Sequence, residues 1–280
     1  MSGDQLARRR CAVLGSPIAH SLSPALHRAA YEHLGLNWHY GRHDVDQAGL
    51  PGFLAGLDSS WRGLSLTMPL KQAALACMDE VSHTARVVEA VNTVVLEPDG
   101  RRRGDNTDVA GMVNGLRERG VRRVPAGAVL GGGATARSAL AALGEIADAA
   151  TAYVRTPARA EQLLASAASL GLPCTVRPWD ERREGLAAPV VIVTTPVGVS
   201  DDLAAAVPDA PGTLLDVVYD SGATPLGTAW GAAGGPVVDG LDLLVHQAVL
   251  QVLLMTGTEV PLGVLREGGQ RALAARDAAG

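Results

Sequence analysis

The pattern of apolar and polar positions divides the chain into short buried strands separated by helices. Short apolar runs bounded by glycine, proline or polar residues are typical of strands in a largely buried sheet. From residue 126 onward such runs alternate with helical spacing, and a β-α-β-α series predicts a mostly parallel sheet with helices on both faces. The predicted strands are residues 11–14, 61–68, 91–96, 126–130, 150–154, 190–194 and 213–218.

Ser23 followed by Pro24 predicts the start of a helix, because a hydroxyl at the N-cap and a proline in the first turn both favour helix initiation. Gly35 is well placed to end that helix. Ser21 lies just ahead of it, on the connection from the first strand. It has no evident capping role there, and a ligand could reach its hydroxyl.

Two further helices are predicted near the C-terminal end. Residues 241–256 are apolar on nearly every side, interrupted by Asp242, His246 and Gln247, which indicates a helix buried on several faces. We expect this helix to pack back onto the N-terminal part of the chain. A more polar helix over residues 261–275 follows it.

Composition narrows the class of protein. A length of 280 residues suggests two domains, and 47% hydrophobic residues supply their cores. A net charge of -5 argues against a nucleic-acid binder. No apolar run reaches the ~18 residues of a membrane span, and the N-terminal apolar segment is too short and broken for a signal peptide. We expect a soluble, cytoplasmic protein that binds neither nucleic acid nor membrane.

The cysteines and histidines do not form a recognisable metal site. Cys11, Cys77 and Cys174 are widely spaced, which suits neither a disulfide framework nor a metal centre. Five histidines crowd residues 20–43, but without the carboxylate spacing of a zinc enzyme. We therefore expect no bound metal.

Lys71 is the only lysine among the 24 basic residues; all the others are arginine. A lysine can change its protonation state in a suitable environment, whereas an arginine effectively cannot. This lone lysine follows Thr67-Met68-Pro69-Leu70 and is expected to open a helix. It is therefore a candidate for proton-transfer chemistry, although a solvent-exposed lysine at a helix start is the alternative.

Glycines 131–133 follow the predicted strand at 126–130 and precede a helix predicted from Arg137. A strand, a glycine turn and a helix N-terminus together offer free backbone N–H groups to a phosphate. The segment therefore favours a dinucleotide site over a plain tight turn. The next strand ends in Val154, Arg155, Thr156, Pro157, Ala158 and Arg159, with no acid for a ribose 2′-hydroxyl. Guanidinium groups suit a 2′-phosphate, so NADP is favoured over NAD; two solvated arginines are the alternative.

The motifs taken together resemble the shikimate dehydrogenase family. They are S-P-I-A-H-S-L-S-P (16–24), S-L-T-M-P-L-K (65–71), V-N-T (91–93), G-D-N-T-D (104–108), the glycine turn, V-R-T-P-A-R (154–159) and D-G-L-D-L-L-V-H-Q-A (239–248), in this order over nearly the whole chain.

For the substrate, the resemblance implies shikimate or 3-dehydroshikimate. Ser21 and Ser23 would bind its carboxylate. Thr67, Asn92 and Gln247 would hold the ring hydroxyls and the carboxylate region, and Tyr219 would also touch the substrate. Lys71 and Asp108 would be the catalytic pair, with Asp108 also binding substrate.

For the cofactor, the resemblance implies NADP. Gly131, Gly132, Gly133, Ala134 and Thr135 would hold the pyrophosphate, and Val154, Arg155, Thr156 and Arg159 would line the 2′-phosphate. Val217 and Gly240 would lie by the nicotinamide.

Each of these polar residues also has an ordinary structural interpretation. Asp108 could cap the helix that follows it, Asn92 could satisfy a backbone group, and Gln247 could bond across a domain boundary. Asn106 is expected to hold its turn.

The sequence also departs from the family pattern, mainly on the cofactor side. Ala134 carries a methyl group within the glycine turn, Val154 replaces an asparagine, and V-T-T-P (193–196) replaces N-A-T-S. On the substrate side, S-L-T replaces N-V-T at residues 65–67.

The resulting expectation is an α/β protein with a discontinuous N-terminal α/β substrate domain and a Rossmann-like NADP-binding domain. The substrate and catalytic domain would comprise residues 1–107 and 241–280, and the dinucleotide domain residues 108–240. The expected reaction is NADPH-dependent, reversible reduction of 3-dehydroshikimate to shikimate in chorismate biosynthesis, by a monomer or homodimer. The alternatives are a quinate/shikimate or aminoshikimate dehydrogenase and a catalytically silent nucleotide-binding regulator.

Overall fold

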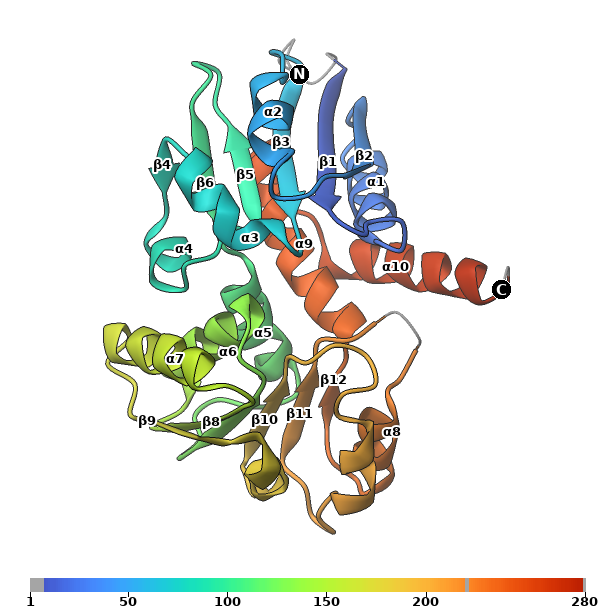
Figure 1. Ribbon diagram of the computed structural model, residues 1–280. Coiled ribbons are helices and arrows are strands. Elements are labelled where there is room, and N and C mark those ends of the chain that lie inside the picture. The colour runs from blue at the N-terminus through green and yellow to red at the C-terminus, as the bar shows by residue number, and fades with distance from the viewer. Residues whose placement is uncertain (1–7, 220–221, 279–280) are drawn as a thin grey trace. The chain divides into compact units, whose positions relative to one another are not determined.

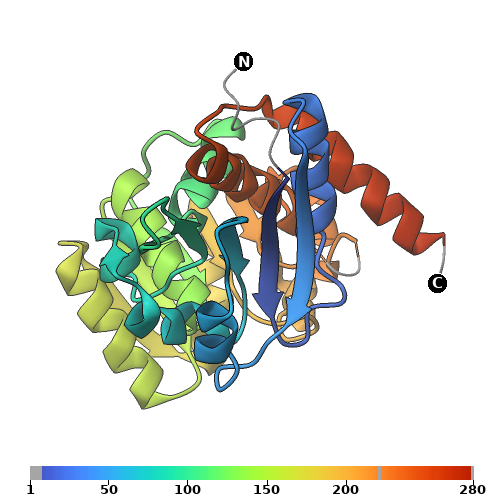
Figure 2. The same ribbon diagram turned by 90° about the horizontal axis from the view of Figure 1, so that it is seen from above.

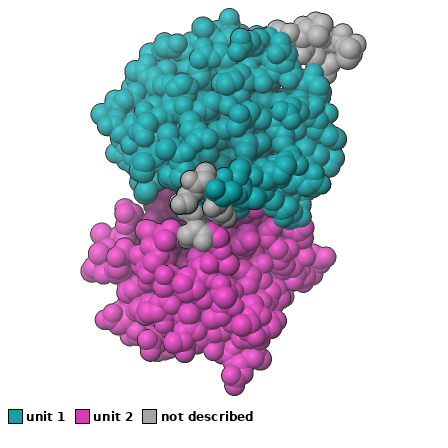
Figure 3. Space-filling model, turned by 90° about the vertical axis from the view of Figure 1, so that its right-hand side faces the viewer, with its two compact units in different colours: residues 1–107, 244–280 teal, residues 108–243 magenta. Residues whose placement is uncertain are grey.

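The computed structural model describes residues 8–219 and 222–278. The chain forms two compact units: unit 1 consists of residues 1–107 and 244–280, and unit 2 of residues 108–243 (Figure 3). The second crossing between the units lies at 243/244, inside helix α9 (Gly240–Thr256), where the sequence predicts 240/241.

Unit 1 is built on a mixed six-stranded sheet in the order β2-β1-β3-β5-β6-β4. The pairs β1/β2, β1/β3 and β4/β6 are parallel, whereas β5 runs antiparallel to both β3 and β6 (Figure 1). The strands are β1 (Arg9–Gly15), β2 (Trp38–Asp44), β3 (Trp61–Leu66), β4 (Glu80–Val81), β5 (Thr93–Leu96) and β6 (Arg102–Asp105).

Helices from both ends of the chain cover this sheet. Helix α10 packs against α1, so the last helix of the chain lies beside the first (Figure 2). The helices are α1 (Ser23–His33), α2 (Leu50–Ala55), α3 (Leu70–Ala73) with the 3₁₀ turn η2 (Ala74–Cys77), α4 (His83–Val87), α9 and α10 (Leu262–Asp277).

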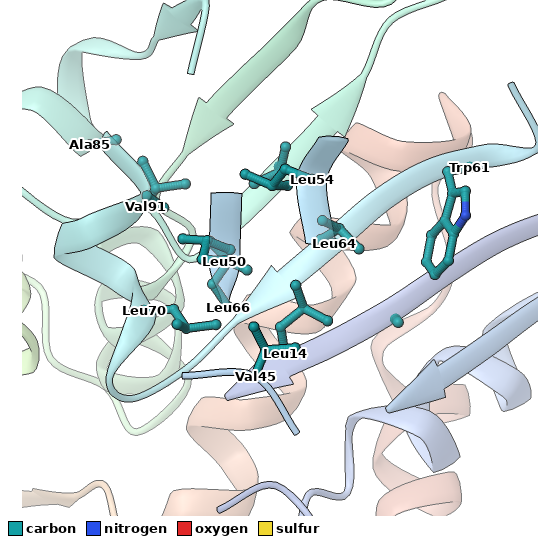
Figure 4. Close-up of a cluster of buried hydrophobic side chains, with 13 residues drawn as sticks. Leu14, Val45, Leu50, Leu54, Trp61, Leu64, Leu66, Leu70, Ala85 and Val91 are labelled. Carbon is teal, nitrogen blue, oxygen red and sulfur yellow. The ribbon is translucent and has the colours of Figure 1, made fainter. Parts of the chain in front are cut away.

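In strand β3, successive side chains alternate between the two faces of the sheet. Leu64 and Leu66 point to one side, where they join a buried cluster with Leu50 and Leu54 of α2 (Figure 4). Ser65, between them, is 4% exposed and points to the other side, where its hydroxyl bonds to Gln251 of α9. One face of the sheet is therefore a purely apolar core, while the other contains buried polar groups.

His27 lies on that second face. It is completely buried, stacks on Tyr40 with ring centroids 4.0 Å apart, and its Nε2 is 3.3 Å from Gln251 Oε1. Burial lowers the pKa of His27 from 6.5 to about 3. The neighbouring Tyr31 and Tyr40 have pKa values raised by burial, so the whole cluster is uncharged at neutral pH.

Burial of a neutral His27 should make unit 1 sensitive to acid. Between pH 6.5 and about 3 the unfolded chain binds a proton that the folded chain excludes, so stability falls as the pH falls through that window. We expect His27→Gln to lose about 1 kcal/mol less unfolding free energy than the wild type between pH 6 and pH 5. Urea unfolding at the two pH values measures this difference, and equal losses in the two proteins would contradict it.

Unit 2 contains an all-parallel six-stranded sheet in the order β12-β11-β10-β7-β8-β9. Numbered along this unit, the order is 3-2-1-4-5-6 from β9 to β12, which is the Rossmann arrangement. The strands are β7 (Gly127–Leu130), β8 (Ala150–Val154), β9 (Cys174–Pro178), β10 (Val190–Val193), β11 (Thr213–Asp216) and β12 (Val237–Val238).

The connections of unit 2 are helical, as parallel strands require. They are α5 (Asp108–Glu118), which enters the unit, α6 (Ala134–Ile146), α7 (Pro157–Ser169), the 3₁₀ segments η3 (Trp179–Ala187) and η4 (Asp201–Ala206), and α8 (Pro225–Ala232). One of the two buried faces of the sheet contacts Leu186, Leu203, Leu226 and Trp230 from these connections.

The described ranges contain neither a membrane-spanning helix nor a metal-binding cluster. In residues 8–219 and 222–278, no helix is long and apolar enough to cross a membrane. Over the same ranges, no group of three or more histidine, cysteine or acidic side chains could hold a metal ion. Cys11, Cys77 and Cys174 are free thiols.

Candidate active site

In unit 1, the candidate residues gather at the carboxyl ends of β1 and β3. Thr67 follows β3, and its N–H donates to the carbonyl of Leu14 at 2.9 Å. A Cβ placed on Gly15 would lie 2.4 Å from the Thr67 methyl group, so Thr67 lies against the start of the 15–23 connection. Figure 1 shows β1 and β3 side by side, as their parallel pairing requires.

Ser21 and Ser23 lie on that connection, each 5% exposed. The predicted capping role of Ser23 is wrong. Helix α1 begins at Ser23 itself, with Leu22 as its N-cap and no side-chain cap bond. Because Ser23 is already inside the helix, its hydroxyl lies too far along the chain to cap the first amides. Instead, Ser21 has the structural contact that the sequence did not indicate: its Oγ accepts the Ser23 N–H at 3.3 Å.

Lys71 is half-buried in the single turn of α3, which begins one residue earlier than expected, at Leu70. The carbonyl of Lys71 accepts from the N–H of Val91 at 2.7 Å. The carbonyl of Asn92 accepts from the N–H of Leu66 at 2.7 Å. These two bonds bring Lys71 and Asn92 together beside the end of β3.

Asn92 is 2% exposed and heavily bonded within unit 1. Its Oδ1 accepts from the N–H of Thr107 at 2.8 Å, so the alternative that it satisfies a backbone group is observed. Its Nδ2 donates to Thr107 Oγ1 at 3.0 Å and faces Gln247 Oε1 at a long 3.5 Å. Gln247, 6% exposed, donates from Nε2 to the carbonyl of Leu244 at 2.9 Å. All these partners of Gln247 belong to unit 1, so these bonds do not cross a domain boundary.

Sequence reasoning missed two buried polar residues beside this cluster. Thr107, 4% exposed, connects Asn92 to Gln247, and Gln251, 1% exposed, bonds to the strands behind them. The position of Gln251 one helical turn after Gln247 was the available signal. Asn106 donates from Nδ2 to the carbonyl of Ala90 at 2.9 Å, which confirms the prediction that it holds its turn.

Asp108 is the first residue of α5 and of unit 2, and it follows Thr107 directly in the chain. It is 7% exposed. A carboxylate in the first turn of a helix is electrostatically favourable. This acid is therefore buried, and in the chain it directly follows a residue of the unit 1 cluster.

In unit 2, the glycine turn lies where the strand order reverses. Gly131 follows β7 and Thr194 follows β10, the two strands on either side of this switch point. Gly131 has a φ of 131°, and a Cβ there would lie 2.3 Å from Thr194 Oγ1, so only glycine fits. A Cβ on Gly133 would meet open space. The chain therefore leaves room above the turn.

Helix α6 begins at Ala134, three residues earlier than predicted, with Gly133 as its N-cap and no side-chain cap bond. Ala134 and Thr135 are thus in the first helical turn, where backbone N–H groups lack intrahelical acceptors. The methyl group of Ala134 is part of the helix rather than of the turn. An anionic group can accept from these amides.

The segment after β8 lies against the glycine turn. A Cβ on Gly132 would be 2.9 Å from the Cβ of Arg159 and 3.2 Å from Val154. Val154 is buried, and Arg155, Thr156 and Arg159 are exposed. The predicted pyrophosphate and 2′-phosphate segments are therefore adjacent within unit 2.

A pocket of about 610 Å³ opens beside Val154, Arg155 and Thr156. Its far side comes from β9 and the start of η3, which the sequence did not implicate: Arg177, Trp179 and Asp180. Arg177 forms salt bridges with Glu181 and Glu184, whereas Arg159 contacts the uncharged Gln162 at 3.3 Å. Of these three arginines, Arg177 is thus the one already neutralised by acids.

The remaining cofactor-side candidates follow β11. Val217 comes directly after Asp216, and a Cβ on Gly240 would lie 2.7 Å from its carbonyl oxygen, so Val217 and Gly240 are in contact. Asp216 fixes this loop by accepting from the Thr224 hydroxyl at 2.7 Å and the Val218 N–H at 3.2 Å. Burial raises the pKa of Asp216. Tyr219, half-buried, is the last described residue before the gap at 220–221.

Each unit therefore carries a distinct chemical capacity. Unit 1 presents hydroxyls and amides beside one lysine, a donor and acceptor set that suits a small molecule with several hydroxyl groups. Unit 2 presents a Rossmann turn, an open helix N-terminus and two arginines, which fit a phosphorylated dinucleotide. A pocket of about 490 Å³ elsewhere in unit 1, lined by Arg9, Trp61 and Arg62 among others, contains none of the predicted site residues.

Comparisons with known proteins agree with this division. The family model described as the shikimate dehydrogenase substrate binding domain matches residues 13–94, within unit 1. A shikimate dehydrogenase (NADP(+)) of Thermus thermophilus is 39% identical over 272 residues, covering 94% of this chain and 98% of that relative.

Two solved structures extend the likeness to the whole fold. Shikimate dehydrogenase of Mycobacterium tuberculosis has a TM-score of 0.85 and 39% identity, covering 95% of this chain and 99% of that one. Shikimate 5-dehydrogenase of Thermus thermophilus, solved in complex with NADP(H) and shikimate, has a TM-score of 0.82 and 37% identity, covering 94% and 99%.

Proposed function

The chain belongs to the shikimate dehydrogenase family, and on that premise we propose that it reversibly reduces 3-dehydroshikimate to shikimate with NADPH, in chorismate biosynthesis. The observation that carries this proposal is the 39% identity, over 94% of the chain, to an NADP-dependent shikimate dehydrogenase. The enzyme is accordingly an oxidoreductase acting on a small molecule.

We propose that unit 1 binds the substrate. Ser21 and Ser23 would hold the carboxylate, and Thr67, Asn92 and Gln247 the ring hydroxyls and carboxylate region, with Tyr219 of unit 2 as a further contact. In support, Thr67, Lys71 and Asn92 come together beside the end of β3. The Asn92–Gln247 contact is long at 3.5 Å, so a substrate hydroxyl could replace it at little cost.

We propose that unit 2 binds NADP. Gly131 to Thr135 would hold the pyrophosphate, Val154, Arg155, Thr156 and Arg159 the adenosine 2′-phosphate, and Val217 and Gly240 would lie by the nicotinamide. The residues present fit this group: the turn after β7 requires glycine, and the helix behind it begins with open amides.

We propose that Lys71 and Asp108 handle the proton, with Asp108 also contacting the substrate. When bound, the nicotinamide supplies or accepts the hydride. The oxygen of the reacting carbonyl gains a proton as the hydride arrives, and Lys71 is the group that donates it. Asp108, a buried carboxylate, would orient the lysine and the reacting hydroxyl. Residues of unit 1 and the first residue of unit 2 would thus share the chemistry.

We further infer a cytoplasmic enzyme that works as a monomer or homodimer, in keeping with a biosynthetic reaction on small diffusible molecules. Size-exclusion chromatography with light scattering distinguishes the two assemblies.

The substrate preference tests the proposal directly. We expect kcat/KM for shikimate with NADP⁺ to exceed that for quinate by at least about tenfold, because the relative on which the proposal rests is an NADP-dependent shikimate dehydrogenase. Absorbance of the reduced nicotinamide measures both rates. Comparable or reversed values would indicate a quinate/shikimate enzyme, and cofactor binding without turnover of either substrate would indicate a regulator.

A further inference from the structure

A continuous chain of buried hydrogen bonds leads from the core of unit 1 to the proposed substrate residues. We propose that Gln251, at its centre, is a positioning residue that fixes the side chain of Asn92 and, through Thr107, that of Gln247. This inference rests on the proposed function, because its consequence is measured as shikimate binding.

Gln251 is saturated by its neighbours. Its Nε2 donates to Thr93 Oγ1 at 2.9 Å and to the carbonyl of Asn92 at 3.2 Å. Its Oε1 accepts from Ser65 Oγ at 2.7 Å and lies 3.3 Å from His27 Nε2. With 1% of its surface exposed, its amide has no room to turn without leaving buried groups unpaired.

The donor and acceptor in each of these hydrogen bonds are determined by the groups at the two ends of the chain of bonds. Tyr40 donates to Ser65 at 2.5 Å, so the Ser65 hydroxyl must point its own proton at Gln251 Oε1. Thr93 donates to Asn92 Oδ1 at 2.7 Å and therefore accepts from the Gln251 amide. If the Gln251 amide were reversed, its Nε2 donor would face the Ser65 hydroxyl proton. Its Oε1 acceptor would then face the Thr93 oxygen.

The same order of donors and acceptors continues to the residues proposed to bind the substrate. With Oδ1 held by Thr93 and by the Thr107 N–H, Asn92 must direct Nδ2 toward Thr107 Oγ1 and Gln247 Oε1. The network therefore determines which amide atom each proposed ligand offers. Neutral His27 closes its inner end without adding a charge.

The network also accounts for a departure from the family pattern. Where the family has asparagine in N-V-T, this chain has Ser65, whose hydroxyl both accepts from Tyr40 and donates to Gln251. A hydroxyl can do both at one atom, which is why this position connects strand β2 to helix α9.

Two substitutions of similar shape interrupt the chain at successive points. Gln251→Met removes the amide, and Thr93→Val removes the hydroxyl that connects it to Asn92. With saturating NADP⁺, we expect each to raise KM for shikimate about tenfold, while KM for NADP⁺ is unchanged and kcat changes less. Because both interrupt one path, the double variant should be no worse than the more impaired single variant.

Val252→Ala is the matched control, because Val252 is fully buried on the same helix and has no side-chain polar group. It should lower Tm while leaving KM for shikimate within about twofold. The inference is overturned if either single variant keeps the wild-type KM, if their effects multiply in the double variant, or if Val252→Ala raises KM as much. A wild-type protein that fails to oxidise shikimate would refute the proposed function instead.

Discussion

Replacing Lys71 by alanine is expected to lower kcat by about 10²–10⁴-fold, the usual loss when a general acid-base group is removed. KM for shikimate should change much less, because the proposed carboxylate and hydroxyl contacts come from other residues. Lys71 is half-buried in the one-turn helix α3, where its backbone carbonyl is tied to Val91. The substitution leaves that bond intact, so the protein should remain folded. Steady-state rates and thermal unfolding measure the two effects.

Lys71→Arg separates proton transfer from charge. It keeps the positive charge, but a guanidinium is a far poorer proton donor, so we expect it to recover little of the lost rate. The pH profile of kcat should lose one limb in both variants. Near-native kcat in Lys71→Arg would mean that Lys71 acts only as a fixed charge, and that Asp108 or a water molecule delivers the proton.

Replacing Arg155 by alanine is expected to raise KM for NADP⁺ by roughly one to two decades, since a charge-assisted phosphate contact contributes about 1.5–3 kcal/mol. The use of NAD⁺, which lacks the 2′-phosphate, should hardly change. The structure strengthens the choice of Arg155: it is exposed at the pocket after β8, whereas Arg177 opposite it is already paired with two glutamates.

Arg183→Ala provides the control for this experiment. Arg183 is also an exposed arginine of unit 2, but it lies outside the pocket and its closest acid, Asp202, is 4.0 Å away. Its loss should leave the KM of both cofactors unchanged. Equal losses with NADP⁺ and NAD⁺ in Arg155→Ala would mean that this side chain does not read the 2′-phosphate.

The buried strands of unit 2 were predictable because both faces of each strand are covered. Residues 150–154 were predicted without error, and 190–194 and 213–218 to within one or two residues, because short runs of mostly apolar residues are typical of strands buried within a parallel sheet. The strands that sequence reasoning missed lie at edges or carry charges. In β2 only Tyr40 is fully buried, and β6 reads Arg-Arg-Gly-Asp. Such strands pair through their backbones, which the side-chain pattern does not record.

The residues of the candidate site also differ in how far the sequence could predict them. Candidate residues within local motifs, such as Thr67 and Gly131, could be proposed from the sequence, because the residues next to them in the chain identify the turn on which they lie. Gln251 and Trp179 were missed, because their contacts depend on strands distant in sequence: Ser65 and Thr93 for the first, Val154 and Arg155 for the second. The Ser23 cap failed for a smaller reason, a one-residue shift in where α1 begins.

The discontinuity of unit 1 has a consequence for how the protein is made. Residues 108–243 contain all of unit 2, so unit 2 can fold during translation as soon as it leaves the ribosome. The part of unit 1 that precedes it cannot be completed then, because Gln247, Gln251 and helix α10 emerge after unit 2. Until they do, the face of the sheet around Ser65 and Thr93 lacks α9, and α1 lacks the helix that packs on it. The N-terminal part of unit 1 is therefore made before unit 2 but completes its fold after it, and until then its uncovered faces need protection from aggregation.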